Sequence, residues 1–389
     1  MAKINPHFSR LHSPYIFPVI EEKLALLTSQ VPPFSIINLG IGDIALPLAP
    51  AVVKAICGAT EEMGVKETQK GYGPSEGYLF LREGVAKSCY GDLGISPEEI
   101  FISDGANSDT SNLQELFAQD SVIAIPDPTY PVYKATNIMA GRADTITLLP
   151  CTIENGFLPQ PPSTRVDLVY ICSPSNPTGV ALNRDAWTRW ITYARENEAL
   201  IVHDHAYSAF IRSPDVPRSV YEIPGANEVV IECCSFSKTA GFTGLRCAWA
   251  VVPRALPHNL HALWKKRTTT KSNGVAYPIQ RGALAALTAE GKQETQEQVD
   301  IYMKQAELLS SGLKKLGFSC FGGTDAPYIW WKTPHGMSSW QFFDTLLEKC
   351  HLVAIPGLGF GPSGEGYIRL STFTTSEIAQ EALARIRKL

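Results

Sequence analysis

The sequence lacks the features that mark several large classes of protein. Its nine cysteines are odd in number and none forms a Cys-x-x-Cys pair, so neither a disulfide framework nor a zinc site is indicated. It has no dense basic run, and a formal net charge of −4 offers no electrostatic footprint for nucleic acid. No uncharged apolar run reaches the roughly 18–20 residues that span a bilayer, and no export signal is visible. We therefore expect a cytoplasmic protein with reduced thiols that binds neither membranes nor nucleic acid.

The composition that is present suits a large globular protein. The 389 residues are 44% hydrophobic and 19% charged, a balance that is usual for folded domains and far from that of disordered chains. At roughly 100–200 residues per domain, the length indicates two or three domains.

Five short apolar runs have the pattern of strands that are buried on both faces. These runs are Val122–Ile125, Leu168–Ile171, Leu200–Val202, Val229–Ile231 and Cys247–Val252. Segments with helical character lie between them, among them Pro131–Ala140 and Asp185–Glu198. Because strands alternate with helices, we predict an α/β fold with a mainly parallel sheet, in a large domain over residues 46–280.

The C-terminal part of the chain has a different pattern. A long helical stretch over Lys292–Leu316 precedes three shorter strand candidates, Cys320–Phe321, Tyr328–Trp331 and Tyr367–Leu370. We predict a smaller α+β domain made of residues 281–389 together with residues 1–45, which contain a predicted helix over Pro18–Ser29. As an alternative to a boundary near Gly282, Tyr277–Glu290 could belong to one long linking helix.

Polar residues follow four of the apolar runs of the large domain. In an open parallel sheet these positions border the ligand crevice. The four segments are Asp127–Pro131, Ser173–Gly179, Asp204–Tyr207 and Ser235–Lys238. Taken singly, Asn176–Gly179 is an ordinary turn sequence and Lys238 an ordinary solvated lysine. Together they offer an amine, a carboxylate, an amide, hydroxyls and aromatic rings at one edge of the sheet.

Pyridoxal phosphate chemistry needs this set of groups. Lys238 supplies the amine that binds the cofactor aldehyde, and Asp204 the carboxylate that keeps the pyridine nitrogen protonated. The phosphate would be held by hydroxyls, a guanidinium and backbone N–H groups at a helix start. Ser235, Ser237, Arg246 and the segment Asp104–Ala106 can supply these groups. Tyr207 and Asn176 suit the phenolic oxygen of the cofactor.

With these residues, the sequence resembles the fold-type I pyridoxal-phosphate aminotransferases of class I/II. The motifs are Asn176-Pro177-Thr178-Gly179, Asp204-x-x-Tyr207, Ser235-x-Ser237-Lys238 and Gly244-x-Arg246, and they occur in the order and spacing of that family. The resemblance extends from about Tyr15 to Arg369. It implies a homodimer that binds pyridoxal 5′-phosphate and transfers amino groups between small amino acids and keto acids.

The resemblance also implies roles for single residues. Those implied to be catalytic are Lys238, Asp204 and Tyr207. Those implied to bind the cofactor are Lys238, Asp204, Tyr207, Asn176, Tyr130, Ser235, Ser237, Arg246, Gly105, Ala106 and Asn107, with Tyr72 from the neighbouring subunit. Those implied to bind substrate are Arg369, on the α-carboxylate, and Tyr15, Gly42, Asn176, Asn273 and Tyr130.

Further motifs resemble a subfamily that acts on LL-2,6-diaminopimelate with 2-oxoglutarate as the acceptor. They include Asn38–Asp43, Gly71–Pro74 and Ala326–Trp330. The chain departs from that pattern where the far end of the substrate would be bound. Asn107 stands where the subfamily usually has lysine, and Ser75 where an acidic residue is common. Lysine or another amino acid therefore remains an alternative substrate.

Three other functions are alternatives at this stage. His203-Asp204-His205 could belong to a metal hydrolase, although alternate residues of a strand face opposite sides and no third ligand is evident. Gly357–Gly361 could belong to a dinucleotide-binding dehydrogenase, but it lacks the required glycine spacing. A catalytically inactive homologue is the third alternative. Intact Lys238 and Asp204 disfavour it.

Overall fold

The computed structural model describes residues 2–11, 16–28 and 36–389. Its largest sheet has seven strands in the order β2-β8-β7-β6-β5-β3-β4. Their bounds are β2 Ile100–Ser103, β3 Ile123–Asp127, β4 Ile146–Pro150, β5 Leu168–Cys172, β6 Leu200–Asp204, β7 Val230–Ser235 and β8 Ala248–Val251. The five strands predicted from the sequence are all present, and β2 and β4 are added to them. The fold is of the α/β class, as predicted.

The strand directions decide which residues meet at one edge of this sheet. The strands from β7 to β4 are parallel to their neighbours, whereas β8 is antiparallel to both β7 and β2. The start of β8 therefore lies at the same edge as the ends of the other strands. This reversal brings Arg246, just before β8, and Gly105, just after β2, to the edge where Asp204 and Lys238 lie.

Both faces of the large sheet are buried, which explains the continuous apolar runs. In β5, Val169 and Ile171 belong to one apolar cluster, whereas Leu168, Tyr170 and Cys172 belong to another. The first cluster includes Trp187 and Trp190 from α6, and the second includes Leu113 from α4. The helices of this part are α2 Pro50–Met63, α3 Leu79–Val85, α4 Ala106–Leu113, α5 Val132–Met139, α6 Arg184–Glu196, α7 Phe236–Thr239, α8 Leu260–Lys271 and α9 Tyr277–Ala286.

A second, smaller sheet lies towards the C-terminus. It is antiparallel, in the order β12-β13-β10-β9. The strands are β9 Cys320–Gly322, β10 Tyr328–Lys332, β12 Ile355–Pro356 and β13 Tyr367–Ser371, and the helices beside them are α11 Ser339–Cys350 and α12 Ser376–Ile386. The three strand candidates predicted here are confirmed.

The N-terminal segment pairs with this C-terminal region. β1 (Ile37–Asn38) forms a parallel pair with β11 (Leu352–Val353), and Ile20 from α1 (Ile16–Thr28) belongs to the apolar cluster of the small sheet. Ser29, the predicted end of the first helix, lies outside the described residues. These contacts place the described part of residues 1–45 beside the small sheet.

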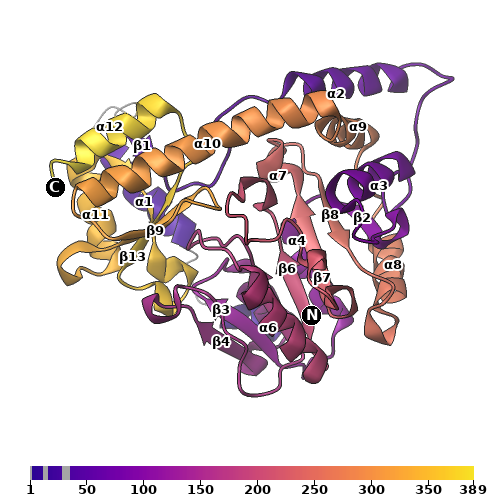
Figure 1. Ribbon diagram of the computed structural model, residues 1–389, viewed down its shortest axis with the longest axis horizontal. Coiled ribbons are helices and arrows are strands. Elements are labelled where there is room, and N and C mark those ends of the chain that lie inside the picture. Colours follow the sequence, from indigo (N-terminus) through magenta and orange to yellow (C-terminus); the bar gives the residue numbers. More distant parts are fainter. Residues whose placement is uncertain (1, 12–15, 29–35) are drawn as a thin grey trace.

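The long helix α10 (Ala289–Lys315) connects the two regions. In Figure 1 it runs from the lobe that holds α11 and α12 to α2 and α9. A single linking helix over Tyr277–Glu290 does not form. Instead, α9 ends at Ala286, and the Thr288 hydroxyl accepts a hydrogen bond from the Gly291 N–H (3.1 Å) to cap the start of α10.

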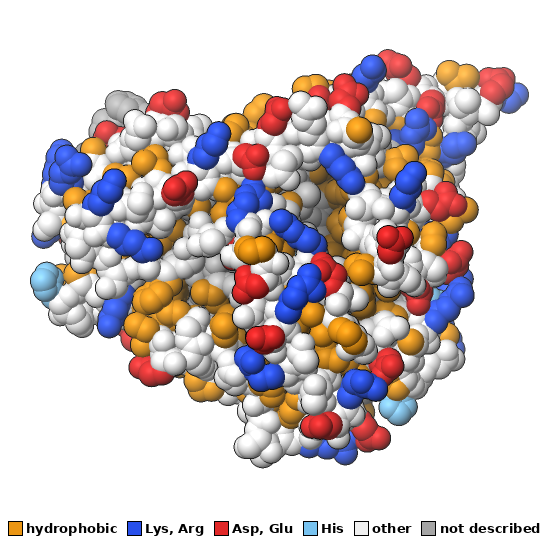
Figure 2. All heavy atoms as spheres, in the orientation of Figure 1, with side chains coloured by type: hydrophobic (Ala, Val, Ile, Leu, Met, Phe, Trp, Pro, Cys, Tyr) orange, Lys and Arg blue, Asp and Glu red, His pale blue; other side chains and the backbone are white. Residues whose placement is uncertain are grey.

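On the face shown in Figure 2, lysine and arginine side chains are interspersed with acidic side chains, so no large area of this face carries charge of one sign. Among the helices that the structure describes, none is both long and apolar enough to cross a membrane.

Candidate active site

A cavity of about 400 Å³ opens at the carboxyl edge of the large sheet. It contains the cationic side chains of Lys238, Arg246 and Arg369 and the acidic side chains of Asp43 and Asp204. The other lining residues are Ile41, Gly42, Ala106, Asn107, Tyr130, Cys172, Asn176, Ala206, Tyr207, Ser235, Ser237, Thr243 and Tyr328. Segments that are far apart in the sequence thus form one site.

Lys238 lies on the short helix α7, directly after β7. Ser235 caps this helix by accepting a hydrogen bond from the Ser237 N–H (3.0 Å). The Lys238 amine donates to the Gly42 carbonyl oxygen. Burial, with help from the nearby Arg369 and Arg246, lowers the pKa of Lys238 to about 8, while Asp43 opposes this shift. An amine with this pKa can gain and lose a proton near neutral pH.

Asp204 ends strand β6 and is buried, with 7% exposure. The Tyr133 hydroxyl donates to its carboxylate over 2.5 Å, and the Ala206 N–H donates over 3.3 Å. Burial raises the pKa of Asp204, and these two hydrogen bonds oppose that rise. Asp204 also lines the cavity, where its ionised carboxylate can accept a hydrogen bond from a protonated ring nitrogen.

Arg246 and the start of α4 form a cradle for an anion. The Arg246 guanidinium donates to the Ser237 hydroxyl (3.2 Å). A side chain at Gly105 would place its Cβ 2.3 Å from the Arg246 Nη2 atom, so glycine is needed for the guanidinium to lie there. The N-cap residue of α4, Gly105, has no side chain to cap the helix, and the N–H groups at a helix start favour an anion such as a phosphate.

Arg369 is a buried cation, with 4% exposure, on β13 of the small sheet. It donates to the Asn176 side-chain oxygen (2.7 Å) and to the Gly40 carbonyl (2.5 Å). Its Nε atom has no hydrogen-bond partner, and the two acceptors that it does contact are both uncharged. The Tyr328 and Phe360 rings lie 4.6 and 4.9 Å from the guanidinium. A buried guanidinium with spare donors calls for a carboxylate from a ligand.

The structure brings most of the predicted site residues into this cavity. The predicted residues that line it are Lys238, Asp204, Tyr207, Asn176, Tyr130, Ser235, Ser237, Arg246, Ala106, Asn107, Arg369 and Gly42. Gly105 does not line the cavity but supports the cradle. Tyr130 donates a hydrogen bond to the Asn107 side-chain oxygen (3.2 Å).

Besides Gly105, two predicted residues that the structure describes do not line the cavity of this chain. Tyr72 is 91% exposed, and Asn273 is exposed on the loop after α8. Neither residue lines the cavity that contains Lys238 of the same chain. Tyr15 lies outside the described residues.

Two residues of the candidate site, Tyr328 and Tyr133, had no role in the site predicted from the sequence. The Tyr328 hydroxyl lies 2.9 Å from that of Tyr207, yet Tyr328 belongs to the small sheet. Tyr133 had no role in the predicted site, although it contacts Asp204. Tyr328 does stand within Ala326–Trp330, so this motif held a signal for it.

The structure does not support a metal site or a dinucleotide site. No group of three His, Cys, Asp or Glu side chains within the described residues is arranged to hold a metal ion. The segment Gly357–Phe360 forms a short 3-10 helix after β12 instead of joining a strand to a helix of a parallel unit.

Comparisons with known proteins agree with this geometry. The family model for aminotransferase class I and II matches residues 35–386. The chain is 47% identical to the LL-diaminopimelate aminotransferase of Methanosphaera stadtmanae and 46% identical to that of Parabacteroides distasonis, over 100% of this chain and 99% of each relative. The solved structure of L,L-diaminopimelate aminotransferase from Chlamydomonas reinhardtii is 40% identical, with a TM-score of 0.94 over 100% of this chain and 98% of that one. The chain therefore belongs to the class I and II aminotransferase family.

Proposed function

We propose that this aminotransferase moves the amino group between LL-2,6-diaminopimelate and 2-oxoglutarate, with pyridoxal 5′-phosphate bound beside Lys238. The observation that carries the proposal is the meeting of Lys238, Asp204, Arg246 and Arg369 in one cavity. The substrate assignment is supported by the relatives at 46–47% identity that are named for LL-diaminopimelate.

The residues present fit pyridoxal phosphate. Lys238 offers an amine whose pKa of about 8 leaves a reactive neutral fraction near pH 7–8. The Arg246 cradle with Ser235, Ser237 and the start of α4 would hold the phosphate, and Asp204 would hold the ring-nitrogen proton. Asn176 and Tyr207 also line the cavity, and Asn176 accepts a hydrogen bond from Arg369. When bound, the cofactor supplies an electron sink for the electrons of the substrate Cα–H bond.

The chain's own residues then orient substrate and move protons. Arg369 would bind the α-carboxylate through its planar fork and so hold the substrate Cα near Lys238. The Lys238 amine would take the proton from the substrate Cα as a general base and would deliver it, as a general acid, to the cofactor carbon that receives the amino group. Asp204 stays ionised throughout, since its charge keeps the ring-nitrogen proton in place.

The two positions where the chain departs from the diaminopimelate subfamily differ in their relation to the cavity. Asn107 lines the cavity, where the subfamily usually has a lysine. Ser75 does not line it, and its Cα lies 3.8 Å from the position a Gly274 side chain would take. We infer that diaminopimelate is the preferred donor and that lysine is the main competitor.

We further infer a cytoplasmic homodimer with shared sites. Tyr72 is 91% exposed, and Asn273 is exposed as well. We expect both side chains to contact the partner's cofactor and substrate. All nine cysteines are free, which suits a reducing compartment. The domains are proposed as residues 46–280 and as residues 1–45 with 281–389.

A panel of amino donors tests the substrate. LL-diaminopimelate, lysine, ornithine, aspartate and phenylalanine are each supplied with 2-oxoglutarate, and glutamate formation is measured, with Lys238→Ala as the inactive control. We expect the highest kcat/KM with LL-diaminopimelate. A higher value with any other donor would overturn the substrate assignment, and glutamate formation by the control would overturn the site.

A further inference from the structure

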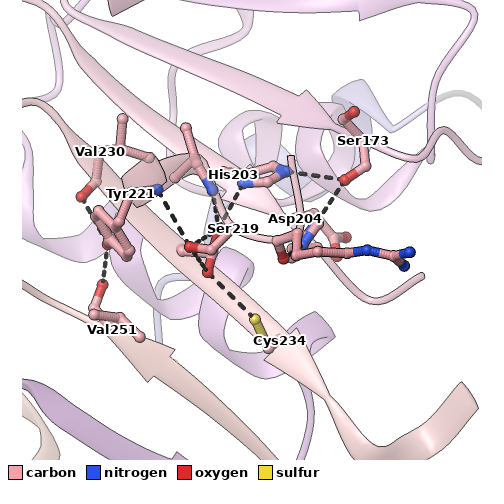
Figure 3. A network of polar contacts seen from close by, with 12 residues as sticks. Ser173, His203, Asp204, Ser219, Tyr221, Val230, Cys234 and Val251 are labelled. Atoms are coloured by element: carbon pink, nitrogen blue, oxygen red, sulfur yellow. Dashed lines mark hydrogen bonds and ion pairs between the residues drawn. The ribbon is translucent and has the colours of Figure 1, made fainter. Parts of the chain in front are cut away.

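Two buried histidines lie on either side of Asp204 in the sequence, and the reaction described above uses neither. His203 is 1% exposed on β6, and His205, directly after the strand, is 3% exposed. Their rings lie together, with centroids 4.5 Å apart. Figure 3 shows His203 facing Ser173 within a larger polar network that includes Ser219 and Tyr221.

Both ring nitrogens of His205 face hydrogen-bond acceptors. Nδ1 lies 2.7 Å from the Ser173 carbonyl oxygen, and Nε2 lies 2.8 Å from the Arg218 carbonyl oxygen. A carbonyl oxygen only accepts, and a neutral imidazole donates from one nitrogen alone. Both contacts are hydrogen bonds only if both nitrogens carry a proton, which makes the ring an imidazolium.

The network also contains a negative charge to compensate this cation. Glu232 on β7 is 1% exposed and lies opposite His203 in the sheet register. Its carboxylate lies 3.2 Å from His203 Nδ1 and accepts hydrogen bonds from the Tyr90 hydroxyl (3.0 Å) and the Val220 N–H (2.9 Å).

Glu232 is ionised in this environment. Burial alone would raise the pKa of Glu232, but His205, His203 and the Val220 N–H together lower it to about 2. A buried carboxylate with several donors is the expected partner of a buried cation. His203 also faces two acceptors, the Glu232 carboxylate (3.2 Å) and the Ser173 carbonyl oxygen (2.9 Å), but burial and the charge of His205 lower its pKa. We therefore assign His203 as the neutral ring, which donates to only one of these acceptors, and assign the charge to His205, whose two contacts are shorter (2.7 and 2.8 Å).

His205 is coupled to the cavity in two ways. First, its positive charge opposes the rise in the pKa of Asp204 that burial causes. Secondly, the Ser173 carbonyl that it binds starts the turn that carries Asn176, and Asn176 accepts the hydrogen bond from Arg369. The titratable groups that act electrostatically with His205 are His203, Asp204 and Glu232.

We propose that His205 is a buried imidazolium that serves as a positioning residue, keeping Asp204 ionised and fixing the base of the Asn176 turn. The part that concerns Asp204 rests on the function proposed above. The protonation state itself does not, so the two can fail separately.

Neutron diffraction of the unmodified, cofactor-loaded protein, crystallised in heavy water near pH 7.5, tests the protonation state. We expect deuterium on both ring nitrogens of His205. Deuterium on only one nitrogen would overturn the proposal. The result depends neither on a variant that folds nor on any choice of substrate.

The pH profile of His205→Gln tests the positioning role. A glutamine side chain has one donor nitrogen and no charge, so we expect the acid limb of kcat/KM to move up by about 0.5–1 pH unit. Activity on that limb should fall about three- to tenfold and recover at higher pH.

The control is Tyr221→Phe, which removes hydrogen bonds to the Val230 and Val251 carbonyls in the same network (Figure 3). This variant should not move the acid limb of kcat/KM. An equal loss of kcat/KM for His205→Gln at every pH would overturn the positioning role. If the unmodified protein turned over none of the amino donors, the proposed function would be overturned instead.

Discussion

The hydroxyl of Tyr133 donates a 2.5 Å hydrogen bond to the carboxylate of Asp204. Tyr133 lies on α5, packed against the ring of Tyr170 (5.2 Å between centroids), and it is 1% exposed. A helix on one face of the sheet thereby helps to ionise a carboxylate at the sheet edge.

The Tyr133→Phe variant tests this relationship. Burial raises the pKa of Asp204 and the tyrosine hydroxyl lowers it, so the variant should raise that pKa further. Activity needs the ionised form of Asp204. As the pH falls, the variant should therefore lose activity at a higher pH than the unmodified protein does. A hydrogen bond to a charged group contributes about 1.5–3 kcal/mol, which corresponds to about ten- to hundredfold in kcat/KM at pH 6.5. Tyr170→Phe is the control, and a pH profile of Tyr133→Phe that matches it would contradict the account.

The Arg369→Lys variant tests recognition of the α-carboxylate. A lysine keeps the charge but loses the planar fork and the contacts with both Asn176 and Gly40. We expect KM to rise about ten- to hundredfold, with a smaller fall in kcat. The control, Arg385→Lys, changes a partly exposed arginine that pairs with Glu381. Equal KM values for both variants would remove Arg369 from this role.

Mixed dimers test whether Tyr72 completes the partner's site. Lys238→Ala and Tyr72→Ala subunits should each be inactive or nearly so alone. A heterodimer of the two has one site free of both changes, so mixing after reversible dissociation should restore activity. Native mass spectrometry would verify subunit exchange, and heterodimers without restored activity would favour sites that lie within one chain.

The double variant Asn107→Lys with Ser75→Glu tests the far end of the substrate. A charge-assisted contact contributes about 1.5–3 kcal/mol, so the ratio of kcat/KM for LL-diaminopimelate over lysine should rise about tenfold or more. Asn107→Gln keeps a neutral amide in the cavity and serves as the control. An unchanged ratio in the double variant would show that these two positions do not govern specificity.

Much of the fold follows from local sequence patterns. The apolar runs that predicted β3, β5, β6 and β7 exist because both faces of the sheet are covered. β4 was not predicted, since Ile146–Pro150 is a partly exposed edge strand with a mixed pattern. β1, β11 and β12 have two residues each, too few for any periodicity to be visible.

The site was predictable where motifs lie directly after strands, and less so where distant segments meet. Lys238, Asp204 and Asn176 each follow an apolar run. The contact between Tyr207 and Tyr328 joins residues 121 positions apart, and the two acceptors around His205 come from Ser173 and Arg218. Such relationships depend on sheet order and on loop paths, which local patterns do not specify.

Covalent trapping tests the central claim most directly. The purified protein, loaded with pyridoxal phosphate, is reduced with borohydride, digested and mapped by mass spectrometry, with Lys238→Ala as the control. The account predicts a cofactor adduct on the peptide that contains Lys238 and no adduct in the control. An adduct on a different lysine, or none on the unmodified protein, would contradict it.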